Sequence, residues 1–171
     1  ACTVETLHAL GVQEVLLVGL CGGFAPQLSV GDVLLPEQLW SEEGTSLHYR
    51  QAEGFVDVPS VQGKALGLCL EGAGFPVQRL PTVTTDAPYR QTFWKEEQWR
   101  GLGCAAVDME ASAVATVCTY YGMACTVALM VSDKHPVREG DPPWTWGSRS
   151  FAESRDRFIA QCAAFALGQK L

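Results

Sequence analysis

The stretch VDMEASA at residues 107–113, followed by VSD at residues 131–133, decides the expected fold. Each stretch closes a short apolar run with acidic residues, and a segment of helical character lies between them. In an open α/β sheet this arrangement places carboxylates at the ends of strands, where ligands bind. One such acid can hold a pair of substrate hydroxyls, and the other can transfer a proton. The sequence therefore predicts an α/β fold with a binding site at the strand ends.

The composition is that of a folded protein and excludes several classes of function. The chain has 171 residues, of which 47% are apolar, so it can build one domain with a substantial core. The net charge is −7 and no cluster of Lys and Arg is present, so no nucleic-acid partner is expected. No apolar run approaches the roughly 20 residues of a membrane helix, and no signal peptide is recognisable, so no membrane partner is expected either.

The seven cysteines argue for a reducing environment. Their number is odd and no C-x-x-C motif occurs, which argues against a disulfide scaffold and against a zinc ribbon. Several of them stand within apolar runs, where a reduced cysteine behaves as a small apolar residue. The predicted location is the cytoplasm, and no metal site is predicted.

Short apolar runs alternate with helical patterns, which is typical of α/β proteins. Strands are expected at residues 14–20, 33–35, 77–84, 105–107 and 124–131. Helices are expected at residues 2–10, 62–72, 96–102, 111–121 and 151–167. Residues 41–60 and 136–147 are polar or rich in proline and are predicted to be loops. Together these elements are predicted to form a single domain over residues 1–171.

Two acids flank Met109 at the predicted start of a helix. An acid at a helix N-terminus is favoured by the helix dipole by ~0.3–1 kcal/mol, which explains one of Asp108 and Glu110. The other can accept two hydrogen bonds from a vicinal diol such as that of ribose, and Met109 offers an apolar surface to a sugar. Asp133 is either the cap of a turn or a partly buried carboxyl group that donates a proton. The two acidic stretches together favour a site.

Other motifs have two interpretations from the residues alone. The turn GLCGG at residues 19–23 is either a tight strand-to-loop turn or a place where a ligand approaches the backbone. The segment TVTTD at residues 82–86 either lines the same crevice or is an exposed strand end. His135, like His8 and His48, is predicted to be a surface or packing residue.

Five short motifs resemble those of one enzyme family. They are VGLCGG at 18–23, VGDV at 30–33, TTD at 84–86, VDMEA at 107–111 and VSD at 131–133. Their order and approximate spacing are those of the nucleoside phosphorylase family, which includes purine nucleoside phosphorylase, uridine phosphorylase and methylthioadenosine nucleosidase. The resemblance covers nearly the whole chain. It implies a three-layer α/β/α sandwich around a central mixed β-sheet.

The resemblance also implies cleavage of the N-glycosidic bond of a nucleoside. The expected reaction is phosphorolysis to a free base and ribose 1-phosphate, with phosphate as co-substrate and no cofactor. By position in the family motifs, Glu110 would bind the ribose hydroxyls, Met109 would pack on the sugar, and Asp133 would protonate or hydrogen-bond the leaving base. The residues implied to border the base are Cys21, Gly22, Val83, Thr84 and Val107.

Two departures from the family pattern keep other reactions open. Family members usually begin with a strand that carries a phosphate-binding glycine or, in the hydrolases, a catalytic glutamate, and no such strand is recognised here. The chain is therefore expected to be a fragment, a processed chain or a shortened homologue. Leu17 and Leu20 also stand where phosphorylases often carry an arginine and a hydroxyl residue for phosphate. A hydrolytic nucleosidase and a silent nucleoside-binding homologue remain alternatives.

The resemblance implies a homo-oligomer, either a dimer or a ring of dimers. Five tryptophans fall mostly in loop-like or short helical segments, and exposed aromatic side chains often mark interfaces. They are Trp40, Trp94, Trp99, Trp144 and Trp146. The alternative is that these side chains fold back over the core.

Overall fold

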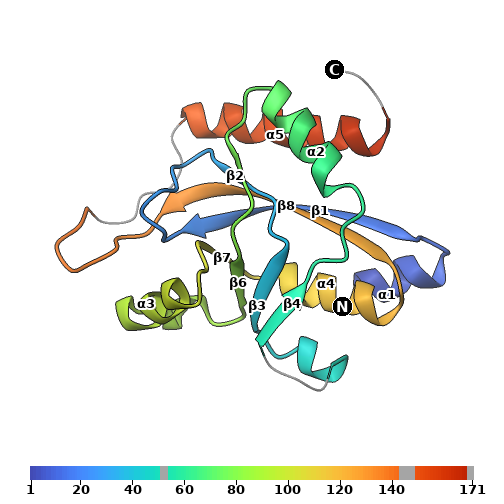
Figure 1. The fold of residues 1–171 in the computed structure, drawn as a ribbon, viewed down its shortest axis with the longest axis horizontal. Coiled ribbons are helices and arrows are strands. Elements are labelled where there is room, and N and C mark those ends of the chain that lie inside the picture. The colour runs from blue at the N-terminus through green and yellow to red at the C-terminus, as the bar shows by residue number, and fades with distance from the viewer. Residues whose placement is uncertain (51–53, 143–148, 169–171) are drawn as a thin grey trace.

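The computed structural model describes residues 1–50, 54–142 and 149–168. Within these ranges, eight strands form one sheet in the order β4-β3-β6-β7-β1-β8-β2-β5 (Figure 1). In chain order they are β1 Glu14–Gly23, β2 Val33–Leu34, β3 Gln38–Glu42, β4 Gly54–Asp57, β5 Val77–Gln78, β6 Thr82–Thr85, β7 Ala106–Asp108 and β8 Ala124–Lys134. β1 runs parallel to β8 and antiparallel to β7. The predicted mixed sheet is confirmed.

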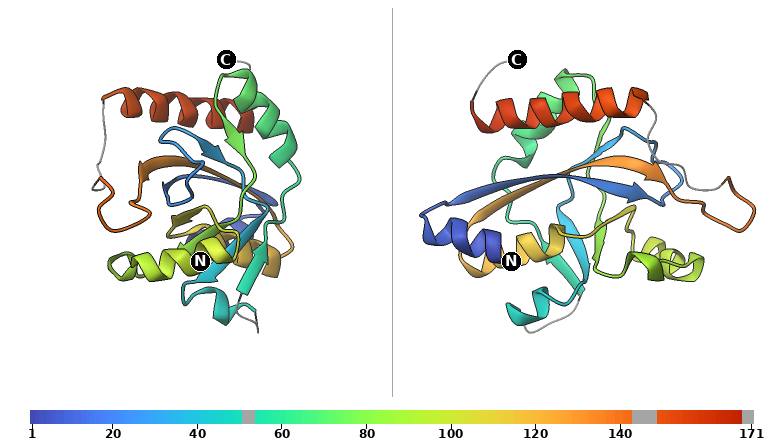
Figure 2. Two further views of the ribbon diagram at one scale, coloured as in Figure 1. Left: turned by 60° about the vertical axis from the view of Figure 1, so that its left-hand side comes forward. Right: turned by 180° about the vertical axis from the view of Figure 1, so that it is seen from behind.

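Helices cover both faces of this sheet. α2 (Gly63–Gly72) and α5 (Arg149–Ala166) lie on one face, and α1 (Cys2–Ala9), α3 (Phe93–Gly101) and α4 (Ala111–Tyr120) lie on the other (Figure 2). Leu66 and Phe158 belong to the apolar cluster under α2 and α5, while Val4 and Ala115 belong to the cluster under α1 and α4. The α/β fold with three layers is therefore confirmed.

β1 and β8 are neighbouring strands in the interior of the sheet, and both of their faces are covered. In β1, Leu16 and Val18 pack against the cluster under α2 and α5, and Val15 and Leu17 pack against the cluster on the other side. Side chains alternate between the faces of a strand, so a strand covered on both sides must be apolar at nearly every position. This explains why a continuous apolar run predicted the strand correctly.

The prediction of a loop over residues 41–60 is wrong in part. β3 extends to Glu42, the short 3₁₀ turn Ser46–His48 follows, and β4 pairs with β3 as the edge strand of the sheet. Some of the polar residues in this region are buried and satisfy one another. Glu43 is 6% exposed and accepts hydrogen bonds from the hydroxyls of Ser41 and Ser112, both at 2.8 Å.

The single strand predicted at residues 77–84 is divided into two. β5 pairs with β2 at one edge of the sheet, whereas β6 pairs with β3 and β7 on the other side of the central strands. Pro81 lies immediately before β6. Proline has no N–H to donate to a sheet, so it is expected at the first residue or outside of a strand.

All seven cysteines are free thiols, and most are buried. Cys2 is exposed and Cys69 is half-buried, while the other five lie in the interior. Among the helices that the structure describes, none has both the length and the apolar character needed to cross a membrane.

Candidate active site

A cleft with a volume of about 980 Å³ opens at the ends of β7, β1 and β8. Its opposite wall comes from the 3₁₀ turn Pro88–Arg90 and from α3. Most of the residues predicted for the site line this cleft. They are Cys21, Gly22, Val107, Met109, Glu110 and Asp133.

The register of the sheet brings these residues together. Gly22 of β1 pairs on one side with Val107 of β7 and on the other side with Asp133 of β8. Three segments that are far apart in the sequence therefore meet in one row across three neighbouring strands. Glu110 follows β7 at the start of α4, so both acidic stretches reach the same cleft.

A shift of register directs Asp133 toward the cleft. Cys21 pairs with Val131, but Gly22 pairs with Asp133, so Ser132 is the extra residue in β8. An extra residue of this kind bends the strand and changes the direction of the following side chain. The Ser132 hydroxyl donates a hydrogen bond to Oδ1 of Asp133. Asp133 is 4% exposed, so it is a buried carboxyl group at a strand end.

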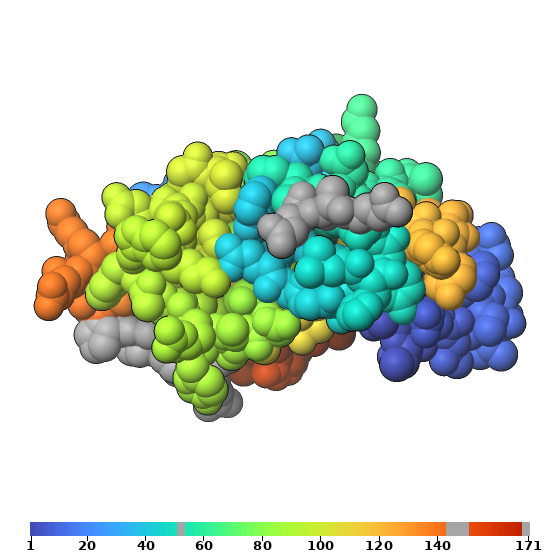
Figure 3. All heavy atoms as spheres, turned by 90° about the horizontal axis from the view of Figure 1, so that it is seen from below, coloured from blue at the N-terminus to red at the C-terminus, as the bar shows by residue number. Residues whose placement is uncertain are grey.

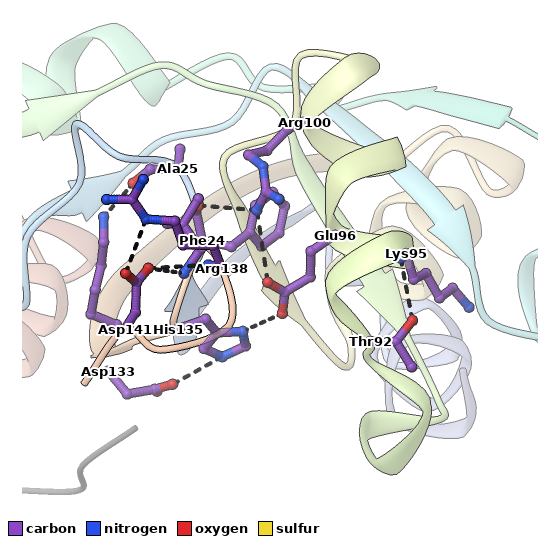
Figure 4. Close-up of polar contacts among 12 residues, drawn as sticks. Phe24, Ala25, Thr92, Lys95, Glu96, Arg100, Asp133, His135, Arg138 and Asp141 are labelled. Carbon is purple, nitrogen blue, oxygen red and sulfur yellow. Dashed lines mark hydrogen bonds and ion pairs between the residues drawn. The ribbon is translucent and has the colours of Figure 1, made fainter. Parts of the chain in front are cut away.

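His135 lies between Asp133 and a second buried acid, Glu96 (Figure 4). Its Nε2 is 3.1 Å from Oδ2 of Asp133, and its Nδ1 is 2.7 Å from Oε1 of Glu96. Burial opposes the charged imidazolium, but the hydrogen bonds to the two carboxylates outweigh it and raise the pKa of His135 to about 9. Arg100 approaches the other oxygen of Glu96 at 3.8 Å.

The sequence predicts a surface or packing residue at His135, and the structure places its half-buried ring in the wall of the cleft between two acids. One signal in the sequence could have located it. His135 stands two residues after Asp133, and residues two apart along an extended segment point to the same side. Glu96 carries no comparable signal, because it reaches the site only through the packing of α3 against the sheet.

α3 is held against the sheet by a buried tryptophan. Trp99 is 1% exposed, and its Nε1 donates a hydrogen bond of 2.7 Å to Oε1 of Glu42. The Thr92 hydroxyl accepts a hydrogen bond from the backbone of Lys95 and caps the helix, which therefore begins before the predicted Glu96. The interpretation of Trp99 as an exposed interface residue is wrong. Trp144 and Trp146 lie outside the described residues.

Asp108 organises the start of α4. Its carboxylate accepts hydrogen bonds from the Thr84 hydroxyl at 2.6 Å and from the backbone N–H groups of Glu110 and Ala111 at 3.0 and 2.6 Å. Burial raises the pKa of Asp108 to about 6, although these three hydrogen bonds act in the opposite direction. Asp108 is thus the acid that caps the helix, and Glu110 is the exposed acid beside the cleft.

Two predicted base-contacting residues do not line the cleft. Val83 and Thr84 are both fully buried in β6. Val83 packs in the apolar cluster with Phe24 and Trp99. The Thr84 hydroxyl donates to Asp108 and accepts from the backbone of Ser112 at 2.9 Å. Thr84 therefore supports a residue of the cleft from beneath, because its side chain faces the start of α4.

A family model described as the phosphorylase superfamily matches residues 1–168. The chain belongs to this superfamily.

Relatives in the superfamily share about a quarter of their residues with the chain. The DeoD-type purine nucleoside phosphorylase of Clostridium beijerinckii is 26% identical over 131 residues, which cover 75% of this chain and 55% of the relative. The guanosine phosphorylase of Halorubrum lacusprofundi is 30% identical over 132 residues, covering 74% and 54% respectively. The chain thus spans about half the length of the curated relatives it matches.

Solved structures confirm the nucleoside phosphorylase fold. The structure of the P. knowlesi homologue of P. falciparum PNP matches with a TM-score of 0.79 at 18% identity. That match covers 98% of this chain and 68% of the other.

The cleft of this superfamily member is acidic. Four carboxyl groups line it, from Glu96, Asp108, Glu110 and Asp133, while His135 is the one potential cation among the lining residues that the structure describes. Cys21 also lines the cleft, and burial, followed by the nearby charges of Asp108 and Asp133, raises the pKa of its thiol well above the ordinary value.

Proposed function

We propose that this chain belongs to an enzyme that cleaves the N-glycosidic bond of a nucleoside. The observation that carries the proposal is the row formed by Val107, Gly22 and Asp133 across three strands, with Glu110 beside it at the start of α4. The row places a buried carboxyl group and an exposed carboxylate in one cleft of suitable size for a small ligand. The membership of the superfamily and the names of the relatives support the same reaction.

Each side chain has a role that its chemistry supports. Cleavage of a glycosidic bond passes through an oxocarbenium-like state, so the sugar must be held and the departing base must lose its negative charge. Glu110 accepts hydrogen bonds from the ribose 2′- and 3′-hydroxyls, and Met109, which is 45% exposed, packs on the sugar. Asp133 delivers a proton to the base. Cys21, Gly22 and Val107 border the base.

The acceptor of the ribosyl group is phosphate in the leading form of the proposal. The relatives are named as phosphorylases, which supports release of ribose 1-phosphate. One observation favours water as the acceptor instead. No Lys or Arg lines the cleft within the described residues, and Leu20 is part of its wall. Leucine cannot hold phosphate through its side chain, so hydrolysis is the second candidate.

A comparison of products separates these candidates. The purified protein is incubated with inosine, guanosine, adenosine and uridine, each with and without phosphate, and the products are resolved by chromatography. Ribose 1-phosphate that forms only with phosphate identifies phosphorolysis, and free ribose in both conditions identifies hydrolysis. If no nucleoside is cleaved in either condition while binding persists, the protein is a silent homologue and the proposed reaction is excluded.

The proposal includes assembly into a homo-oligomer. Tyr89 and Phe93 line the cleft and are exposed, at 100% and 46%, and Trp94, which follows Phe93 on α3, is 67% exposed. Exposed aromatic groups that are close together are a common feature of interfaces. Figure 3 shows the molecule from below, with the yellow-green segment that includes α3 toward one end and the blue N-terminal segment at the other end.

A further inference from the structure

The three groups Glu96, His135 and Asp133 form a continuous hydrogen-bonded chain from α3 to the end of β8 (Figure 4). Each ring nitrogen of His135 faces a carboxylate oxygen, at 2.7 Å on one side and 3.1 Å on the other. An imidazole can satisfy two carboxylate acceptors at once only in its protonated form, because only then do both ring nitrogens carry hydrogen. The geometry therefore suits an imidazolium held between two anions.

This arrangement bears on the source of the proton in the reaction. Asp133 has a hydrogen-bond donor beside each of its oxygens, the Ser132 hydroxyl at Oδ1 and the His135 ring at Oδ2. When Asp133 accepts both of these hydrogen bonds, it carries no proton of its own to give to a departing base. The group that does hold a proton beside Oδ2 is His135.

We propose that His135, oriented by Glu96, is the proton reservoir from which Asp133 protonates the departing base. This inference rests on the proposed function. It assigns His135 a role that acts through Asp133, and it makes Glu96 a positioning residue that acts through His135.

The proposed transfer balances in protons and charge. As the glycosidic bond breaks, its electron pair moves to the base. The proton on Nε2 of His135 moves to Oδ2 of Asp133, which becomes a neutral carboxylic acid, and His135 becomes a neutral imidazole. Asp133 then transfers a proton to the ring nitrogen of the base and returns to the carboxylate form. His135 regains its proton from water before the next turnover.

A glycine is required beside this chain of groups. A Cβ atom placed on Gly22 would lie 2.3 Å from Nε2 of His135 and 3.1 Å from Oδ2 of Asp133. A methyl group at this position would therefore collide with the imidazole and displace His135 from its place between the two acids. The same residue that joins β7 and β8 in the sheet thus leaves room for the imidazole.

The charged groups around His135 determine how its protonation changes with pH. Beyond the burial that opposes protonation, Asp133 from β8 and Glu96 from α3 raise its pKa, which is about 9. Lys134 turns away, with its ammonium group on the carbonyls of Ala25 and Leu28. The remaining charged or titratable groups along the described cleft are Cys21, Tyr89, Asp108 and Glu110, and Arg100 lies behind Glu96. His135 is therefore protonated at neutral pH, and the proton is lost as the pH rises through about 9.

A comparison of leaving groups tests the proposal directly. His135→Gln is assayed with inosine, whose base needs a proton, and with 4-nitrophenyl riboside, whose nitrophenolate leaves without one. We expect a loss of ~10²–10⁴-fold in kcat for inosine, the usual size of a general acid contribution, and little change for the nitrophenyl substrate. His48→Gln, which replaces an exposed histidine outside the cleft, is the matched control. An equal loss for both substrates, or no loss for inosine, overturns the proposal.

A pH profile of Glu96→Gln provides the second test. The rate of inosine cleavage by the wild-type protein should fall as the pH rises through about 9, because His135 loses its proton there. Removal of the Glu96 charge should move this fall to lower pH, and His135→Gln should abolish it. A merely structural role for Glu96 would lower the rate without moving the profile.

Nuclear magnetic resonance of the His135 side chain in the free protein gives a readout that does not depend on activity. The titration of the ring signals with pH gives the pKa of His135, and a pKa near the ordinary value of about 6.5 overturns the proposal. If the wild-type protein cleaves no nucleoside, the proposed function itself fails, and that result is distinct from a failure of His135 alone.

Discussion

Glu110 and Asp133 are both carboxyl groups, and their different surroundings suit different chemistry. Glu110 is exposed at the start of α4, where a charged carboxylate can accept hydrogen bonds from a sugar without being desolvated beforehand. Asp133 is buried at the end of β8 and hydrogen-bonded to Ser132 and His135. Enzymes commonly separate the tasks of two acids by such differences in environment.

Replacement of Glu110 by Gln should weaken turnover while the fold persists. A neutral amide accepts hydrogen bonds from a diol more weakly than a carboxylate does, so the expected loss is about 1.5–3 kcal/mol in transition-state binding. Steady-state kinetics with the preferred nucleoside measures this loss as kcat/KM. Glu97→Gln, an exposed acid of α3 outside the cleft, should behave as the wild-type protein. Wild-type kinetics of the Glu110 variant would remove Glu110 from the ribose role.

Replacement of Asp133 by Asn should impair purine nucleosides selectively. Asparagine can donate a hydrogen bond but cannot transfer a proton, so kcat for inosine and adenosine should fall by ~10²–10⁴-fold with little change in binding. Uridine should depend on Asp133 less, because a pyrimidine lacks the ring nitrogen that a purine presents to it. The three substrates are measured side by side in the same preparation. Purine turnover at the wild-type rate would reduce Asp133 to a strand-end cap.

At the scale of the element, the junction of β7 and α4 depends on one buried acid. Asp108 joins β6 to α4 through Thr84 and holds the first turn of the helix through two backbone N–H groups. Because Glu110 is the N-cap residue immediately before this helix, the position of the proposed ribose-binding group depends on Asp108. Asp108 therefore supports the site without having to contact a substrate.

Asp108→Asn should change how stability depends on pH. The folded protein raises the pKa of Asp108 to about 6, mainly through burial, against an ordinary value of about 3.9. A raised carboxyl pKa means that the folded state binds the proton more tightly, so this contribution to stability is greatest at low pH and is lost as the pH rises through about 6. The expected loss is of the order of 2–3 kcal/mol.

Urea unfolding at pH 4 and pH 7.5 measures this effect. Asparagine does not ionise, so the free energy of unfolding of the variant, relative to that of the wild-type protein, should be higher at pH 7.5 than at pH 4. Asp156→Asn, which removes an exposed carboxylate of α5, should leave the wild-type pH dependence in place. If the free energies of unfolding of Asp108→Asn and of the wild-type protein change equally with pH, the raised pKa of Asp108 is contradicted.

The elements that could be predicted from the sequence are those whose signals are local. β1 and β8 are continuous apolar runs because both faces are covered, and α4 begins at an acid and ends before Gly122. β3 and β4 were missed because polar residues stand in and around these two strands, and some of those residues are satisfied by partners far away in the sequence. Glu42, for example, accepts a hydrogen bond from Trp99 and forms an ion pair with Lys95, and both of these residues are on α3. No pattern within residues 38–57 indicates those contacts.

The residues of the site also divide into those that the sequence identifies and those that it does not. Glu110, Met109 and Asp133 stand in short motifs, and the resemblance assigned them to the site together with Cys21, Gly22 and Val107, all of which line the cleft. Glu96 could not be found, because its approach to His135 depends on how α3 packs through Trp99.

At the scale of the whole molecule, the 3₁₀ turn Pro88–Arg90 and α3 join the cleft to the surface that we propose for assembly. Tyr89 and Phe93 both line the cleft and are exposed, and Trp94 follows them on α3. A partner that covers these side chains would also narrow the entrance of the cleft. Assembly and substrate access are therefore expected to influence each other.

Light scattering at micromolar concentration should show a dimer or a larger ring of dimers. Trp94→Arg introduces a charge into the proposed contact and should shift the measured mass toward that of a single chain. Leu10→Arg is the matched control, because Leu10 is also exposed, at 76%, but lies just beyond α1 at the other end of the molecule. A clean monomer mass for the wild-type protein would contradict the prediction.

The burial of the cysteines has a practical consequence for labelling. Cys2 is the one fully exposed thiol, and it lies on α1, away from α3 (Figure 1). Cys21 borders the cleft, but its raised pKa keeps it as a thiol, which reacts poorly with maleimides. Brief treatment with a maleimide dye at neutral pH should therefore attach about one fluorophore per chain, as counted by mass spectrometry, with the half-buried Cys69 reacting more slowly. The tumbling of that dye would then report ligand-dependent changes in size without any engineered cysteine.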